Sequence, residues 1–248
     1  MKISLAHPDK VYRIDVSKPL DISIPVRGAG ATIGAWYLEP PTITPHCEEG
    51  FVGSVSEGGF VNFNDIWFNP HSHVTHTESI GHISETVYDV QNCLDRFFFT
   101  AKVITVVPRE REGDLVITQS QLQREIGEGT YEAVVIRTLP NTDAKETKVY
   151  SHTNPPYLLE EAAQYLKERG VLHLLVDLPS VDKEKDNGLL LAHKAFWDFN
   201  GKPRMNATIT EFIYVDTAIP DGNYVLNLQV APFVNDASPS RPVLYQPL

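Results

Sequence analysis

Four histidines and a carboxylate lie within twelve residues of this 248-residue chain. The histidines are His71, His73, His76 and His82, and the carboxylate is Glu78. Imidazole nitrogens and carboxylate oxygens are the ligands that hold a catalytic zinc or a similar divalent ion, and such a site leaves a coordination position open for water. Short histidine-rich tracts bind metal more often than they occur by accident. We therefore favour a metal site over a polar surface loop.

The spacing within this tract predicts which side chains can share one ion. In a strand, residues of equal parity face the same side, and neighbours on that side lie roughly 6.5 to 7 Å apart. His76 and Glu78 are such a pair, and both side chains can lean onto one ion. Ser72 and His82 have the same parity, and Gly81 permits a turn that would bring His82 back towards the ion. We predict a strand followed by a turn, because β-branched residues and an interior glycine suit a helix poorly.

The rest of the chain predicts many strands and few helices. β-branched or alternating runs indicate strands, and amphipathic runs flanked by proline or glycine indicate helices. The predicted strands cover residues 21–26, 102–107, 133–137, 171–176, 207–215 and 224–231, and the predicted helices cover 118–126, 157–169 and 189–197. This pattern predicts an α/β fold with a mixed β-sheet or partial barrel and few flanking helices. No repeat or linker composition is present, so we expect a single domain over residues 1–248.

Composition and charge narrow the choice of partners. The net charge of −11 and the pI near 5.2 argue against a nucleic-acid partner, which requires a basic surface. No apolar stretch is long enough to cross a bilayer and the first residues lack the apolar run of a signal peptide, so we expect a cytoplasmic protein with no membrane partner. The two cysteines, Cys47 and Cys93, fit reduced thiols better than a disulfide framework. Small molecules are the expected partners.

Two residues outside the histidine-rich tract could complete a metal site. Glu211 has the strand parity of Ile209 and Ile213, so its carboxylate would point into an apolar face, which is costly unless a cation or hydrogen bonds satisfy it. The alternative is that this face lies at an exposed edge, or that Glu211 pairs with a lysine or arginine. His193 follows an apolar run, where a histidine taken by itself is more often a packed core residue than a ligand.

The tract resembles the motif HxGTHxDxPxH of metal-dependent hydrolases of the cyclase family, which includes bacterial kynurenine formamidase and isatin hydrolase. Thr75, His76 and His82 match its central TH and its final histidine, and Glu78 stands in place of its aspartate. The segment DLPSVD at residues 177–182 is similar to the family's DxPSxD segment. The likeness extends over nearly the whole chain and implies a swivelling β/β/α-type cyclase fold.

The resemblance also implies a metal centre and a reaction. His193 and Glu211 lie where the family has a further ligand histidine and a late ligand glutamate. The expected ligands are His76, Glu78, His193 and Glu211, together with His71 if it takes the place of the motif's first histidine. Zinc is the expected metal and manganese the alternative. The implied reaction is arylformamidase-like, as in tryptophan catabolism: a metal-activated water attacks the carbonyl of an aromatic amide or formamide and the C–N bond is cleaved. His82 would act as proton shuttle.

Two departures from the motif leave alternatives open. The first histidine of the motif falls at Ser72, and its glycine falls at Val74. A one-residue bulge near Val74 would turn either His71 or His73 onto the face of Ser72, and we favour His71. The same departures support a different reading, in which the scaffold binds a small molecule or a metal without catalysis. A hydrolase of cyclic amides or lactones is a further alternative. The family likeness suggests a homo-oligomer, either a dimer or a tetramer.

Overall fold

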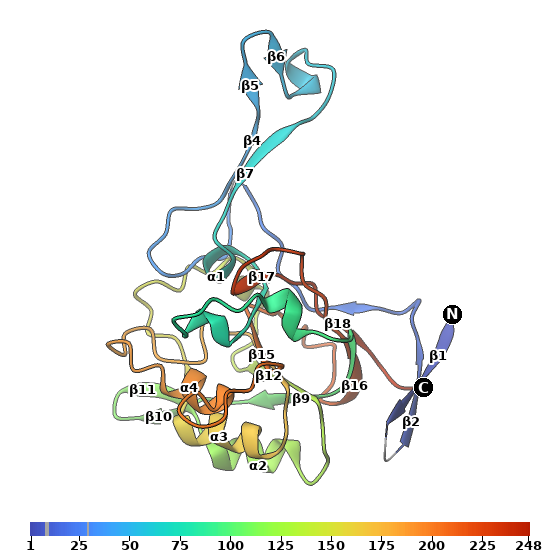
Figure 1. Cartoon of the computed structure of the whole chain (residues 1–248), viewed down its shortest axis with the longest axis vertical. Helices are drawn as coiled ribbons and strands as arrows, with labels where there is room; N and C mark the ends of the chain where they lie inside the picture. Colours follow the sequence, from blue (N-terminus) through green and yellow to red (C-terminus); the bar gives the residue numbers. More distant parts are fainter. Residues whose placement is uncertain (8–9, 29) are drawn as a thin grey trace.

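A curled, mixed β-sheet forms the centre of the molecule (Figure 1). The structure is a computed structural model and describes residues 1–7, 10–28 and 30–248. Within these residues the sheet has nine strands, in the order β17 (Ala237–Pro239), β8 (His76–Glu78), β15 (Thr208–Glu211), β14 (His173–Val176), β12 (Ala133–Thr138), β9 (Phe98–Val106), β16 (Gly222–Asn227), β18 (Val243–Tyr245) and β3 (Leu20–Asp21). The central strands β9, β12, β14 and β15 are parallel, and the outer strands pair antiparallel. The predicted α/β fold with a mixed sheet is confirmed.

Three helices cover one face of this sheet (Figure 1). They are α2 (Gln119–Ile126), α3 (Glu160–Glu168) and α4 (Leu191–Trp197). A capping box between Thr118 and Gln121 starts α2 close to its predicted position. Helix α3 starts later than predicted, because the strand β13 (Tyr157–Leu158) pairs with β11 (Asp114–Ile117) just before it.

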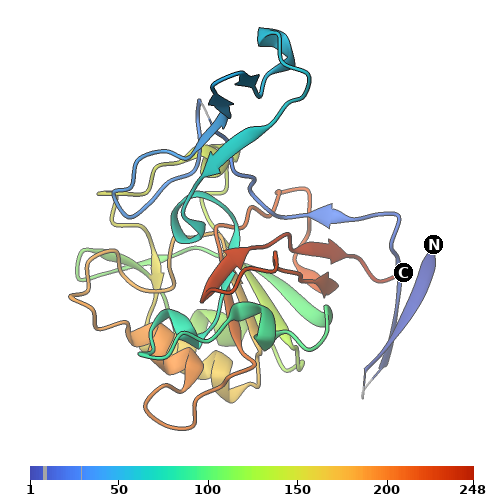
Figure 2. The ribbon, with the colours of Figure 1, turned by 45° about the horizontal axis from the view of Figure 1, so that its top comes forward.

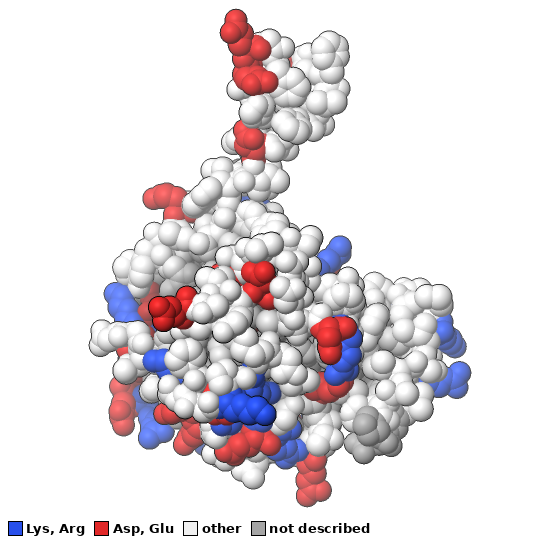
Figure 3. Space-filling view, in the orientation of Figure 1, with Lys and Arg blue, Asp and Glu red and all other residues white. Residues whose placement is uncertain are grey.

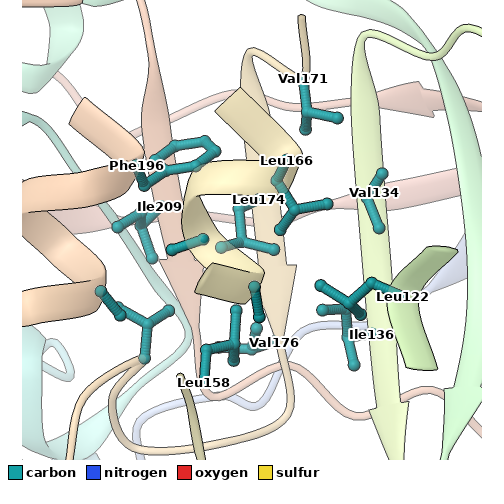
Figure 4. Packing of buried hydrophobic residues seen from close by; sticks show 14 of the residues in the cluster. Leu122, Val134, Ile136, Leu158, Leu166, Val171, Leu174, Val176, Phe196 and Ile209 are labelled. Carbon is teal, nitrogen blue, oxygen red and sulfur yellow. The ribbon is translucent and has the colours of Figure 1, made fainter. Parts of the chain in front are cut away.

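The apolar faces of the helices pack on the sheet (Figure 4). Leu122, Leu166 and Phe196, one from each helix, are buried against Val134 of β12 and Leu174 of β14. The alternate residues of β12 and β14 join a second core on the opposite face of the sheet. Both strands are therefore buried on two sides, which is why they have continuous apolar sequences.

Two hairpins and several short elements surround this body (Figures 1 and 2). The strands β1 (Lys2–His7) and β2 (Lys10–Asp15) form a hairpin beside the two termini. A second projection, which we call the arm (residues 42–67), contains β4 (Thr42–Pro45), β5 (Cys47–Glu48), β6 (Phe51–Val52), η1 (Val55–Glu57) and β7 (Asn64–Trp67). The remaining elements are α1 (Pro70–His73), η2 (Ile80–His82), η3 (Val90–Cys93), β10 (Arg109–Arg111) and η4 (Asp143–Thr147).

The strand predicted over residues 21–26 is mostly wrong. Only Leu20–Asp21 pairs as a strand, and Ser23 forms an isolated bridge with Ile213. Pro25 lacks the N–H that a longer ladder requires. The alternation of this segment still predicted burial correctly, because both of its isoleucines are buried.

No helix in the described part of the chain is long and apolar enough to span a membrane.

Candidate metal centre

Four elements bring together the five residues that we call the His/Glu cluster: His71, His76, Glu78, His193 and Glu211. His76 and Glu78 lie on β8, and His76 pairs in register with Glu211 at the end of β15. Helix α1 contributes His71 and helix α4 contributes His193. The sequence predicted all five as site residues, and the fold places their side chains at one location.

Helix α1 decides which of three neighbouring residues reaches the cluster. The prediction of a strand with a bulge is wrong here, because Pro70 and the Asn69 cap start a short helix that ends at His73. Ser72 turns away and hydrogen-bonds to the backbone of Ala35. His73 also points elsewhere, since its Nδ1 accepts a hydrogen bond from the backbone N–H of Asn69. His71 is the residue directed at Glu78.

The inner faces of the cluster consist of three imidazoles and two carboxylates at short range. His193 Nε2 lies 3.1 Å from Glu78 Oε1, and His71 Nδ1 lies 3.2 Å from Glu78 Oε2. Glu211 reaches His76 Nε2 at 3.5 Å and His193 Nε2 at 3.9 Å. Four of the five side chains are buried and only His71 keeps some exposure. Five ligand-type groups therefore converge at a largely buried location.

Each of these histidines uses its other ring nitrogen for a hydrogen bond directed away from the cluster. His71 Nε2 lies 3.0 Å from Asp236 Oδ2, and His193 Nδ1 lies 2.6 Å from Asp182 Oδ2. His76 places Nδ1 at 3.1 Å from a backbone carbonyl two residues earlier. Such outer acceptors fix the tautomer and the ring orientation of metal-binding histidines. The arrangement directs the inner ring nitrogens of all three histidines towards the carboxylates.

Two polar atoms of the cluster indicate what is needed to complete it. His76 Nε2 and Glu78 Oε2 are buried, and neither forms a hydrogen bond with any residue that the structure describes. Buried polar atoms without partners are rare because they cost free energy. A divalent cation would bind both atoms. The ligand atoms of His71, His76 and Glu78 lie within 4.8 Å of one another, as do those of Glu78, His82 and His193. Nitrogen and carboxylate ligands fit zinc or manganese.

The ionisation of the cluster is consistent with a cation site. Burial and the neighbouring charge of Glu78 raise the pKa of Glu211 above its usual range. Burial lowers the pKa of His76 to about 3, so this imidazole is neutral and able to bind a metal. Burial also lowers the pKa of His71, but Asp236 and Glu78 outweigh it and raise that pKa to about 10 in the absence of a metal. A cation would relieve the repulsion between the two glutamates.

His82 lies at the edge of the cluster, between the carboxylates and the solvent. Its Nδ1 is 3.2 Å from Asp236 Oδ2 and 3.8 Å from Glu78 Oε2, and its ring stacks on that of His71 with centroids 4.3 Å apart. The predicted turn is present as η2, and it requires glycine at position 81. A Cβ on Gly81 would lie 2.5 Å from a backbone nitrogen. His82 therefore lies within reach of both the cluster and the solvent.

Sequence reasoning gave no role to two carboxylates that the structure places beside the cluster. Asp182 accepts hydrogen bonds from the backbone N–H groups of Ala192 and His193 at 2.8 and 3.1 Å, and it also holds the ring of His193. The likeness of residues 177–182 to the DxPSxD segment could have indicated Asp182, which is the last residue of that segment. Asp236 hydrogen-bonds both His71 and His82. Nothing in the sequence around Asp236 indicated this position.

Glu211 is buried as predicted. The strand alternation that we assumed for residues 209–213 ends at Glu211, however, because the strand itself ends there. Phe212 has a φ of 56°, and this left-handed residue ends the strand. Ile209 therefore packs in the core beneath the helices, whereas Ile213 packs in the core on the opposite face. Glu211 Oε1 accepts a hydrogen bond from the backbone N–H of Val181 at 3.0 Å, and this contact leaves Oε2 directed at His76.

A pocket of about 400 Å³ opens beside the cluster. Its apolar wall comes from Trp36, Leu38 and Leu190, and the cluster supplies the opposite side. Lys183, Glu184 and Asp186 also line this pocket. Glu184 there accepts a hydrogen bond from the Tyr37 hydroxyl. The pocket can hold a small molecule with an apolar part against the tryptophan and a polar group against the cluster.

Comparison with known proteins identifies the family. The Cyclase family model matches residues 14–183 of the chain. The chain belongs to the cyclase family. A search of curated proteins finds no match to this sequence.

Solved structures show the cyclase-family fold over almost the whole chain. A potential metal-dependent hydrolase with cyclase activity has a TM-score of 0.66 and 16% identity, covering 92% of this chain and 97% of its own. An isatin hydrolase bound to the product analogue thioisatinate has a TM-score of 0.64 and 19% identity, with 93% of each chain covered. Isatin hydrolase A from Labrenzia aggregata, bound to benzyl benzoate, has a TM-score of 0.65 and 15% identity, covering 93% of this chain and 94% of its own. At such identities the likeness establishes the fold.

Proposed function

We propose that this member of the cyclase family is a metal-dependent hydrolase that cleaves the C–N bond of an amide, with arylformamidase-like specificity. The observation that carries the proposal is the pair of buried atoms that form no hydrogen bond with the described residues, His76 Nε2 and Glu78 Oε2, at the centre of five ligand-type side chains. The relatives of similar fold include a metal-dependent hydrolase and isatin hydrolases, which supports the same reaction class.

In this proposal the His/Glu cluster holds the cation, and zinc is the expected metal. When bound, a divalent ion lowers the pKa of a water molecule and polarises the carbonyl of the substrate. The protein keeps the ligand geometry fixed through the outer hydrogen bonds to Asp182 and Asp236. The adjacent pocket places the substrate, with Trp36 and Leu38 along its apolar part and the amide carbonyl towards the cluster.

His82 moves the protons of the reaction. Its imidazole accepts a proton from the attacking water and returns it to the departing nitrogen, because its ring lies between the cluster and the solvent. Asp236 lies 3.2 Å from His82 Nδ1 and orients the ring. Partial exposure of His82 lets it exchange protons with the solvent between turnovers.

A cyclic amide or lactone substrate is the second candidate. Its support is that two of the solved structures with a similar fold are isatin hydrolases, and isatin is a cyclic amide. The third reading, a protein that binds without catalysis, rests on Ser72 and Val74, and the contact of His71 with Glu78 at 3.2 Å weighs against its argument from Ser72.

Hydrolysis assays with and without metal test the proposed function. The protein as purified, the chelator-treated protein and the protein reloaded with zinc or manganese are assayed on N-formyl arylamines, isatin and aromatic lactones. We expect hydrolysis of an aromatic formamide that is lost with the chelator and restored by the metal. Preferred hydrolysis of isatin or a lactone would support the second candidate. A metal-loaded protein inactive on all three classes would contradict the proposal.

A further inference from the structure

One segment of the pocket beside the His/Glu cluster carries three carboxylates. They belong to Asp182, Glu184 and Asp186, and all three residues line the pocket. The metal centre does not offset their charge. A divalent ion would be balanced by Glu78 and Glu211, and histidines are neutral when they bind a metal. The charge of the rest of the pocket therefore depends on this segment.

Glu184 keeps its negative charge, because the groups that hold it are neutral. Its carboxylate accepts hydrogen bonds from the Tyr37 hydroxyl at 2.7 Å and from the backbone N–H groups of His152 and Asn154 at 2.6 and 2.9 Å. Burial raises the pKa of Glu184, but these hydrogen bonds outweigh it and leave the pKa below its usual value. Neutral donors stabilise a carboxylate without cancelling its charge.

The residues that donate to Glu184 are themselves fixed in place. Tyr37, His152 and Asn154 have φ values of 61°, 65° and 46°, in the left-handed region that side chains other than glycine rarely adopt. The backbone N–H of Tyr37 donates to Ser151 Oγ at 2.9 Å, and its ring packs on that of His152 with centroids 4.5 Å apart. The carboxylate of Glu184 is therefore held at a defined position in the pocket wall.

Asp186 is held by neutral donors as well. Its carboxylate accepts hydrogen bonds from the backbone N–H groups of Gly188 at 2.8 Å and Leu190 at 2.6 Å. Leu190 also forms part of the apolar wall of the pocket. This loop therefore places a carboxylate beside the surface that would contact the apolar part of a substrate.

The lysines of the same segment do not neutralise the pocket. Lys183 lines it, but its ammonium group lies 2.7 Å from Asp114 Oδ2, and Asp114 does not line it. Lys185 is exposed and lies over the ring of Tyr37 at 5.7 Å. Within the part of the chain that the structure describes, no other lysine or arginine lines the pocket. Over the lower part of the body in Figure 3, acidic and basic side chains lie side by side, whereas the pocket keeps a net negative charge.

We propose that Glu184 and Asp186 are specificity-determining residues, which favour an aromatic amide that carries a cationic amine and disfavour one that carries a carboxylate. This inference rests on the proposed function, because it names the substrate class of the same site. The aromatic ring lies against Trp36, the amide carbonyl points towards the cluster, and the amine lies against the two carboxylates. Charges interact more strongly in a partly enclosed pocket than in bulk water.

Three formanilides that differ only in the group para to the formamide test the proposal. The group is aminomethyl, hydroxymethyl or carboxylate, so the compounds are cationic, neutral and anionic near neutral pH. Values of kcat/KM are measured with the zinc-loaded wild type. Calorimetry gives the dissociation constants of the three arylamine products, which requires no turnover. We expect the cation to be preferred over the neutral compound and the neutral compound over the anion, with at least about a tenfold difference between cation and anion.

Glu184→Gln and Asp186→Asn each remove one negative charge and keep an oxygen that can accept hydrogen bonds. Each should reduce the ratio of cation to anion affinity at least about threefold. The matched control Glu168→Gln, which removes an exposed carboxylate of α3, should keep the wild-type ratio. The ratio is the readout because a loss of pocket structure would weaken all three ligands alike. Added salt should lower the wild-type ratio and leave the affinity for the neutral compound unchanged.

The outcomes separate the charge preference from the proposed reaction. Equal binding of the three arylamines, tightest binding of the anion, or a ratio that both variants retain would overturn the charge preference. Equal hydrolysis of all three formanilides would also overturn it, while supporting the reaction. If the arylamines bind in the expected order and no formanilide is hydrolysed, the charge preference is supported and the proposed reaction is contradicted.

Discussion

The histidines of the cluster are each held at one nitrogen so that the other can serve a metal. The shortest of these outer contacts, 2.6 Å, joins His193 Nδ1 to Asp182. Asp182 also accepts the first N–H groups of α4, so one carboxylate sets both the position of the helix and the ring orientation of its histidine. Outer carboxylates of this kind increase the basicity of a histidine ligand and fix its tautomer.

Asp182→Asn should lower the zinc affinity about 10- to 100-fold, because a neutral amide holds the ring of His193 less firmly. Titration against a chromophoric chelator measures this change. The matched control is Asp198→Asn, at the other end of α4, where the carboxylate pairs with Lys167 at 3.0 Å. Equal zinc affinities in the wild type and Asp182→Asn would show that the outer carboxylate does not tune the site.

His82→Ala should retain its metal and lose about 100- to 10,000-fold in turnover, because it removes the residue that moves the protons. Metal analysis and a hydrolysis assay on the same preparation separate the two effects. Normal turnover in this variant would exclude the proton-shuttle role, and loss of metal would instead assign His82 to the ligand set.

Much of the cluster could be predicted at the scale of single residues. The parity of His76 and Glu78 followed from their spacing alone, and the burial of Glu211 followed from its aliphatic neighbours. Asp236 could not be predicted, because it lies 154 residues from His82 and no local pattern marks it. Contacts of that separation depend on how the strands are ordered in the sheet.

At the scale of elements, a short helix replaced the strand expected before β8. The β-branched residues after His73 suggested a strand, but Asn69 followed by Pro70 is a helix-start signal, with a capping side chain and a proline at the first helical position. One helical turn rotates His71 onto the side of Glu78 and turns Ser72 away. If the Asn69 cap had been given more weight than the β-branched residues, the sequence would have predicted this helix.

The pairing of β9 with β12 carries a pH-dependent contribution to stability. Glu132 precedes β12 and accepts hydrogen bonds from Arg96 at 2.6 Å and from the backbone N–H of Thr100 at 2.8 Å. Burial raises the pKa of Glu132, but these hydrogen bonds outweigh it and leave the pKa below its usual value. A carboxyl whose pKa is lower in the folded state stabilises the protein above its unfolded pKa. That contribution disappears as the pH falls through the folded pKa.

Glu132→Gln should therefore lower the free energy of unfolding by about 1–2 kcal/mol at neutral pH. The difference from the wild type should shrink as the pH falls through the lowered pKa of Glu132, where the wild-type carboxyl takes up its proton. Denaturant unfolding at several pH values measures both effects, with the exposed Glu128→Gln as control. A difference that stays constant with pH would show that the charge of Glu132 contributes nothing.

At the scale of the whole molecule, the fold class was predictable and the strand order was not. The apolar runs at β9, β12 and β14 identified the buried centre of the sheet, because strands covered on both faces have largely apolar sequences. The antiparallel place of β8 between β15 and β17 depends on pairings far apart in sequence. The arm was not predicted, because its side chains are ordinary for a strand and only the fold leaves them exposed.

The central claim is that the His/Glu cluster is a metal centre, and metal analysis of the purified protein tests it most directly. The wild type and Glu211→Gln, with the exposed Glu161→Gln as control, are loaded with zinc, freed of unbound metal and analysed by plasma mass spectrometry. The wild type and the control should carry near-stoichiometric zinc, and Glu211→Gln should lose most of it, because the amide removes the charge that faces His76 Nε2 at 3.5 Å. A wild type that binds no zinc or manganese, or a Glu211→Gln variant with undiminished metal, would contradict the claim.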